Sequence, residues 1–165
     1  MKTVLLMRHA EAAPESALQT DYDRPLTEDG VRMATLTGEA WKSVGSGLDR
    51  VVASAAVRTT ETARLFAAKV APGCPIILLK ELYAAPADRF AQVPLQYGYE
   101  DDQSILIVGH NPGIGQLMCY FAKDLISVPP ATLAEFQFDV SDWNEISRET
   151  ATLVRLLRNG RVEIG

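Results

Sequence analysis

Apolar and polar residues follow one another along this chain in blocks that predict strands and helices in turn. Short apolar runs, which are typical of buried strands, occupy residues 3–7, 49–54, 75–79 and 104–108. Apolar residues with helical spacing occupy residues 27–43, 55–71 and 87–97, and a further helix is expected to begin at Asn111-Pro112. This regular alternation favours an α/β fold with helices packed on a sheet.

The last part of the chain has a different pattern. Residues 134–140 read AEFQFDV, which predicts a half-exposed strand, and residues 151–157 and 161–164 flank the hairpin signal Asn159-Gly160. Together the elements predict a three-layer α/β sandwich with a largely parallel central sheet, folded as a single domain over residues 1–165. The aromatic residues expected in its core are Trp41, Phe66, Tyr120 and Phe121.

Composition narrows the possible functions. The chain of 165 residues is 47% hydrophobic and 22% charged, with a formal net charge of −5. An acidic chain is not expected to bind nucleic acid or anionic membrane in general. Its apolar runs are too short to span a membrane, and Arg8 interrupts the first one too early for a signal peptide. We therefore expect a cytoplasmic protein, in which Cys74 and Cys119 are free thiols. The oligomeric state is not predicted.

Candidate chemistry lies where the predicted strands end. Arg8-His9 follows the first strand, Ser54 ends the second with Arg58 just beyond it, and Gly109-His110 ends the fourth. Parallel strands end at the same edge of a sheet, where open α/β proteins bind ligands. Two Arg and two His side chains beside helix amino termini indicate an anion site, most economically a phosphate site. Taken singly, each His is more often a core or capping residue and Arg58 a solvated one, so the prediction depends on their coincidence at strand ends.

Three segments resemble the signatures of the histidine phosphatase superfamily. They are LLMRHAEA at residues 5–12, SAAVRTTETA at 54–63 and LIVGHNP at 106–112, and DRPLTEDG at 23–30 and LKELY at 79–83 extend the resemblance. The sequence departs from the family pattern at Ala10, where Gly is usual, and at Ala55, where Pro often follows the Ser. An Ala is tolerated at residue 10 only if the turn there does not need a positive φ.

The compact length and the short span from Glu81 to His110 are most similar to the SixA-type phosphohistidine phosphatases. The resemblance implies a compact phosphoglycerate mutase-like fold in which His9 is the nucleophile and becomes phosphorylated. It implies that Arg8, Arg58 and His110 bind the phosphoryl oxygens, with no metal and no cofactor. Glu81 matches the acid/base position of many members. A structural role for Glu81, with Asp21 or Asp23 as the general acid, is the alternative.

The expected substrate follows from leaving-group chemistry. An imidazole, whose conjugate acid has a pKa of about 6.5, leaves far more easily than an alkoxide, so an uncertain general acid favours phosphohistidine over a sugar phosphate. The expected partner is thus a phosphorylated protein such as a histidine phosphotransfer domain. The alternatives are a phosphomonoesterase acting on small phosphate esters by the same chemistry, and a phosphate-binding module without catalysis.

Overall fold

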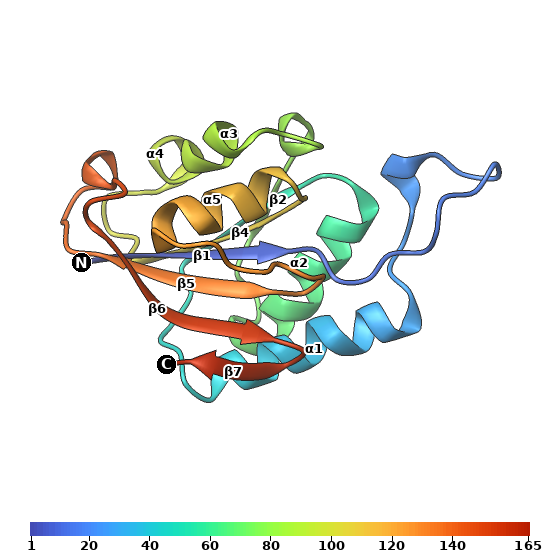
Figure 1. Cartoon of the computed structure of the whole chain (residues 1–165), viewed down its shortest axis with the longest axis horizontal. Helices are drawn as coiled ribbons and strands as arrows, with labels where there is room; N and C mark the ends of the chain where they lie inside the picture. Colours follow the sequence, from blue (N-terminus) through green and yellow to red (C-terminus); the bar gives the residue numbers. More distant parts are fainter.

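A mixed sheet of seven strands forms the centre of the computed structural model, which describes residues 1–165 (Figure 1). The strand order is β3-β2-β4-β1-β5-β6-β7. The first four strands in this order are parallel, whereas β5, β6 and β7 are antiparallel to their neighbours. The prediction of a largely parallel sheet was therefore wrong for the carboxyl-terminal strands. The strands are β1 (Lys2–Arg8), β2 (Arg50–Ser54), β3 (Ile76–Leu79), β4 (Ser104–Gly109), β5 (Leu133–Phe138), β6 (Ala151–Arg158) and β7 (Arg161–Ile164).

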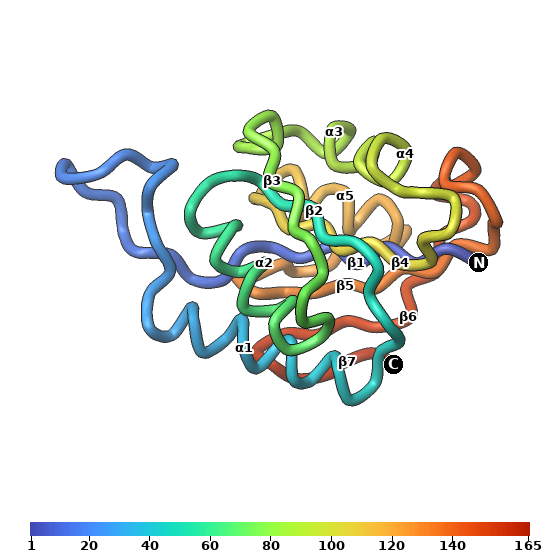
Figure 2. The backbone as a smooth tube through the Cα atoms, turned by 180° about the vertical axis from the view of Figure 1, so that it is seen from behind, coloured from blue at the N-terminus to red at the C-terminus, as the bar shows by residue number.

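Helices lie on both faces of the sheet, as Figures 1 and 2 show from opposite sides. One face carries α1 (Glu28–Lys42) and α2 (Val57–Val70). The other face carries α3 (Ala87–Ala91), α4 (Val93–Tyr97) and α5 (Gly113–Ala122). The short 3-10 helices are η1 (Asp21–Asp23), η2 (Lys80–Leu82) and η3 (Trp143–Glu145). No helix is long and apolar enough to cross a membrane.

The two faces of the central strands build two separate cores. Side chains alternate across a strand, so Val4 and Leu6 of β1 pack in one apolar cluster while Leu5 and Met7 pack in the other. All four side chains are at most 1% exposed. This double burial explains why β1 and β4 are continuous apolar runs in the sequence.

Strand β5 is buried, where the sequence predicted a half-exposed strand. It lies between β1 and β6, and its polar residue Glu135 is only 1% exposed. The Glu135 carboxylate accepts hydrogen bonds from Trp41 Nε1 at 2.9 Å and from Arg155 Nη1 at 2.8 Å. These partners allow a charged residue at a core position.

A second correction concerns Tyr120, which was expected in the core and is 54% exposed.

The helix predicted over residues 87–97 is divided in two. Helix α3 ends before Gln92, and α4 begins at Val93 with Pro94 in its first turn. Helix α5 starts one residue later than predicted, because Pro112 rather than Asn111 occupies the N-cap position. The Asn111 side chain still serves the helix start, since its Oδ1 accepts a hydrogen bond from the Gly115 amide at 3.1 Å. The helix thereby begins directly beside His110.

Candidate active site

The ends of β1, β2 and β4 bring the predicted side chains to one place. Strands β1 and β4 pair in parallel with Arg8 opposite Gly109, so His9 and His110 leave the sheet side by side. Their ring centroids are 5.5 Å apart. Both line a cavity of about 340 Å³ together with Arg8 and Arg58. The remaining residues that line this cavity are Glu11, Ala12, Arg24, Asn111 and Pro130.

His9 is fixed in one tautomer by the main chain. Its Nδ1 lies 2.7 Å from the carbonyl oxygen of Ala10, which can only accept, so Nδ1 carries the proton. The lone pair of the neutral ring is then on Nε2, which has no protein partner. Burial lowers the pKa of His9 to about 4, and the charges of Arg58 and Arg8 add to this effect. His9 is therefore a neutral nucleophile at neutral pH.

Ala10 fits the turn after β1 without strain. It is fully buried and is not among the non-glycine residues with positive φ. Its amide donates a hydrogen bond to Thr62 Oγ1 at 3.0 Å, and the Thr62 hydroxyl donates to the carbonyl of Arg58 at 2.7 Å. The turn thus does not require the glycine that is usual at this position.

His110 presents a donor with no partner. Its Nε2 lies 2.7 Å from Ser54 Oγ, whose hydroxyl proton has no other acceptor. Ser54 therefore donates to Nε2, which leaves the ring proton on Nδ1, and Nδ1 is buried without a hydrogen bond. Burial lowers the pKa of His110 to about 3, with the neighbouring His9 and Arg58 as further causes.

The arginines also have unmet donors. Arg8 Nη1 donates to the carbonyl of Val128 at 3.0 Å, and Arg58 Nη1 donates to the carbonyl of Asp21 at 2.7 Å. The Nε atoms of both arginines are buried and have no partner. Buried donors are normally satisfied, so unpaired donors in three residues that line one cavity indicate a missing acceptor. A phosphoryl group supplies acceptors of that charge and geometry.

Arg24 lines the cavity, whereas the sequence left open whether it reaches the phosphate or pairs with Asp23 or Glu28. Its Nη1 donates to the carbonyl of Ala13 at 2.7 Å, and its Nε donates to Asp21 Oδ1 at 2.9 Å. The DRPLTEDG segment that contains Arg24 was the available signal. Its pairing with Asp21, rather than with Asp23 or Glu28, depends on how the loop folds.

Asp21 is an ion-pair partner. It accepts hydrogen bonds from the hydroxyl of Tyr83, from Arg24 and from Arg58 Nη2, the last at 3.1 Å. These bonds, that of Tyr83 first, hold the pKa of Asp21 well below its usual range. A carboxylate that remains ionised has no proton to give, so this environment suits Asp21 poorly to the role of general acid.

The other candidate acids lie away from the cavity lining. Glu81 is exposed in η2, and its Oε1 accepts from the hydroxyl of Tyr97 at 3.4 Å. Asp23 Oδ2 accepts from the hydroxyl of Thr20 at 2.8 Å. The carboxylate that does line the cavity is Glu11, which accepts from the Thr27 hydroxyl at 2.8 Å. The role of Glu81 as general acid stays a prediction.

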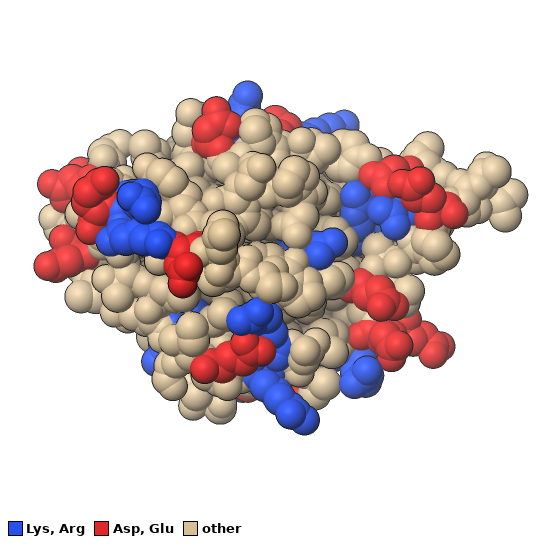
Figure 3. Space-filling model, in the orientation of Figure 1, with Lys and Arg blue, Asp and Glu red and all other residues tan.

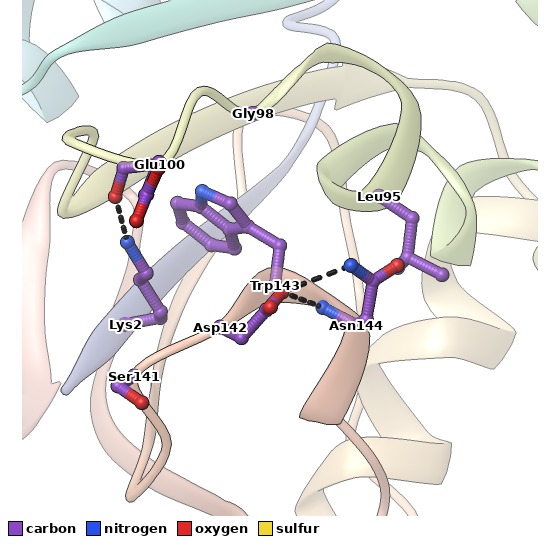
Figure 4. A pocket seen from close by; sticks show the side chains of 8 residues that line it. All are labelled: Lys2, Leu95, Gly98, Glu100, Ser141, Asp142, Trp143 and Asn144. Carbon is purple, nitrogen blue, oxygen red and sulfur yellow. Dashed lines mark hydrogen bonds between the residues drawn. The ribbon is translucent and has the colours of Figure 1, made fainter.

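A second hollow, of about 470 Å³, lies at the opposite end of β1 (Figure 4). It is lined by Lys2, whose side chain is 2% exposed, and by Trp143. Lys2 Nζ donates to the carbonyls of Glu100 and Asp102, both at 2.7 Å, and lies 4.9 Å from the centroid of the Trp143 ring. This buried cation is paired within the protein and holds loop ends together.

Charge elsewhere on the molecule is mixed. On the face drawn in Figure 3, Lys and Arg are interspersed with Asp and Glu, so the arginines of the cavity are not part of a broad basic surface. No group of three or more His, Cys, Asp or Glu side chains is placed to hold a metal ion. Cys74 and Cys119 are free and half-buried.

Sequence comparison assigns the family. A model of the histidine phosphatase superfamily (branch 1) matches residues 4–89, which include Arg8, His9 and Arg58. The chain therefore belongs to the histidine phosphatase superfamily.

Solved structures and a sequence relative are similar to this chain over most of its length. The fold is similar to that of a candidate phosphohistidine phosphatase SixA from Nakamurella multipartitia, with 26% identity, a TM-score of 0.80 and 95% of each chain covered. It is also similar to the protein histidine phosphatase SixA solved with tungstate, with 21% identity, a TM-score of 0.79 and 95% and 97% of the two chains covered. An uncharacterized protein of Mycobacterium tuberculosis is 30% identical over 129 residues, which are 78% of this chain and 77% of the relative. Family and fold both support a phosphatase function.

Proposed function

We propose that this protein hydrolyses phosphohistidine on a protein through a covalent intermediate on His9. The observation that carries the proposal is the state of His9: its Nδ1–H is bound by the Ala10 carbonyl at 2.7 Å, which directs the lone pair of Nε2 toward a ligand. The ring is buried beside arginines and a second histidine whose donors lack partners. This is a nucleophile set in an anion site.

In the first step, Nε2 of His9 attacks phosphorus as the bond between phosphorus and the substrate imidazole breaks. The electron pair of that bond goes to the imidazole nitrogen, which takes up a proton. Arg8, Arg58 and the Nδ1–H of His110 bind the phosphoryl oxygens, on which negative charge is spread in the transition state. No charge has to be supplied by a metal ion in this scheme.

In the second step, water attacks the phosphorus of phospho-His9. The bond between phosphorus and Nε2 breaks, its electron pair returns to His9, and inorganic phosphate leaves. The carbonyl of Ala10 keeps the proton on Nδ1 throughout, so that the ring emerges in the tautomer that reacts again.

The position of the acidic residues supports phosphohistidine as the substrate. Asp21 is held ionised by its partners, and Glu81 bonds Tyr97 outside the cavity lining. An alkoxide leaving group needs a strong, well-placed acid, whereas an imidazole, with a conjugate acid of pKa about 6.5, takes its proton from solvent at neutral pH.

The test is a substrate comparison with a trapped intermediate. We expect the purified protein to dephosphorylate a phosphorylated histidine phosphotransfer domain faster than it hydrolyses phosphoserine or an aryl phosphate, in the presence of a chelator. Rapid quenching is expected to trap acid-labile phosphate on His9, and a His9→Gln variant to lose both activity and label. Faster turnover of small esters would replace the proposal with a small-molecule phosphomonoesterase. Phosphate binding without turnover of any substrate would leave a binding module.

A further inference from the structure

The two most exposed large apolar side chains of the protein are leucines on two loops that contribute to the phosphate cavity. Leu18 is 95% exposed and Leu125 is 90% exposed. Both lie on loops that build the cavity wall: the loop of residues 12–26 contributes Ala12 and Arg24, and the segment after α5 contributes Pro130. Single exposed leucines are common, whereas two on the loops around one cavity indicate a surface that binds a partner.

The first loop projects from the body of the protein and is fixed at its base (Figures 1 and 2). A β-bridge joins Ala12 to Leu26, and Arg24 binds the carbonyl of Ala13. A second bridge, between Ser16 and Gln19, closes the turn that carries Leu18. In Figure 3 the tip of this projection shows neither acidic nor basic side chains. The loop therefore presents an uncharged tip from a base that belongs to the active site.

The second segment continues into the exposed side of α5. A hollow of about 420 Å³ is lined by residues that include Asn111, Gln116, Leu125 and Val128. Asn111 lines the phosphate cavity as well, so the hollow adjoins it. Helix α5 has no charged residue, and its solvent side adds Tyr120. Charged side chains border this second surface, because Leu125 also lines a hollow together with Lys123, Asp124 and Arg148.

We propose that Leu18 and Leu125, on the two loops that contribute to the cavity wall, form an apolar rim that docks the protein substrate. This inference rests on the proposed function. The cavity of about 340 Å³ accepts the phosphoryl group, and the rim extends beyond it on two sides, where a small phosphate ester does not reach. The occupant that fits both is a folded protein with apolar side chains around its phosphorylated histidine.

Charge argues against a second copy of this chain as the occupant. A symmetric partner docked on the rim would bring two cavities, each with Arg8, Arg24 and Arg58, toward one another. A phosphorylated protein instead brings negative charge to the arginines and apolar surface to the rim. The rim thus adds affinity for a protein that a small anion cannot gain.

The experiment replaces each rim leucine with aspartate and compares two substrates. For Leu18→Asp and Leu125→Asp we expect kcat/KM on a phosphorylated histidine phosphotransfer domain to fall about 5-fold to 10-fold each, chiefly through KM, and about 50-fold in the double variant. The kcat/KM on an aryl phosphate is expected to stay within 2-fold. Leu95→Asp, at the far hollow of Figure 4, is the matched control and is expected to change neither value.

The outcomes separate the rim from the proposed function. An unaltered rate on the phosphoprotein in the double variant overturns the rim and leaves the proposed function standing. An equal loss on both substrates also overturns it, because the leucines would then shape the cavity itself. A parent protein that forms dimers which the double variant cannot form would assign the rim to self-association instead. Absence of phosphoprotein turnover in the parent protein overturns the proposed function and the rim with it.

Discussion

At the amino end of β1, the ammonium of Lys2 is 2% exposed, donates to two main-chain carbonyls and lies against an indole ring. At the carboxyl end of the same strand, Arg8 donates to one carbonyl, and its buried Nε has no partner. Arg58 lines the same cavity, and its Nε is also buried without a hydrogen-bond partner.

The difference teaches how to interpret a buried cation. A cation whose donors are paired with main-chain carbonyls contributes to folding, because its desolvation is offset within the protein. A cation with unmet donors has that cost offset only when a ligand arrives. Strand β1 therefore has a structural site at its amino end and a binding site at its carboxyl end.

The largest effect is expected from Arg58→Met. Loss of a charge that contacts the phosphoryl oxygens is expected to lower kcat/KM about 10³-fold, equivalent to about 4 kcal/mol of transition-state stabilisation. The free energy of unfolding is expected to fall by only about 1–2 kcal/mol, because the Asp21 carbonyl loses a donor but the Asp21 carboxylate keeps Arg24 as its partner. Steady-state kinetics and urea denaturation measure the two quantities. A large loss of stability with intact kcat/KM would place Arg58 with Lys2 as a structural cation.

The next effect is the pH dependence of stability. The pKa of His9 is lowered to about 4 in the folded protein, against about 6.5 in an unfolded chain. Between these values the unfolded state binds more protons, so stability falls as the pH drops from about 6.5 toward 4, by about 3 kcal/mol for this residue. Urea denaturation at pH 7 and pH 4.5 measures the loss. A His9→Gln, His110→Gln double variant serves as the control, and a loss as steep as in the parent protein would exclude these residues as its cause.

A smaller effect is expected at the opposite end. Lys2→Met leaves the carbonyls of Glu100 and Asp102 without their donor and is expected to lower the free energy of unfolding by about 2 kcal/mol. Activity at 25 °C is expected to stay within 2-fold of the parent value, because no contact links Lys2 to the cavity. A fall of kcat/KM beyond 2-fold, without a loss in the free energy of unfolding, would show that Lys2 acts on the active site and would contradict the distinction between the two ends.

The smallest effect tests the support of the nucleophile. Thr62→Val removes the acceptor of the Ala10 amide while keeping the shape of the side chain, and about 1 kcal/mol of stability is expected to be lost. Because the Ala10 carbonyl orients His9, kcat is expected to fall about 10-fold with KM little changed. Thr62→Ser, which keeps the hydroxyl, is expected to restore most of kcat. Equal losses in both variants would show that packing, not the hydrogen bond, is responsible.

Much of the fold could be predicted because the central strands are buried on both faces. The runs at residues 3–7 and 104–108 have no polar interruption, so their boundaries lie within two residues of β1 and β4. Strand β5 could not be assigned a buried position. Its Glu135 reads as a solvent-facing residue until Trp41 and Arg155 are known to reach it, and those partners lie 94 and 20 residues away. The hairpin signal Asn159-Gly160 correctly predicts that β6 and β7 are antiparallel, whereas the direction of β5 follows from pairings that no local pattern records.

For the site, the strand-end rule predicted the residues that the sheet itself positions. His9 and His110 follow directly from the parallel register of β1 and β4, and Arg58 follows from the helix after β2. Arg24 reaches the cavity through the loop of residues 12–26, and Glu11 directly precedes that loop. The shape of that loop depends on two bridges, Ala12 to Leu26 and Ser16 to Gln19, and on the Asp21 ion pairs. No periodicity in the sequence encodes either.

The bond from His9 to the carbonyl of Ala10 has a consequence for how the protein can change over generations. Every amino acid has that carbonyl, so no substitution at residue 10 deletes the group that orients the nucleophile. Glycine and alanine are exchangeable there as long as the turn keeps its path, and a mutational scan of side chains would not detect the contact. The tautomer of His9 is thus inherited through the course of the main chain.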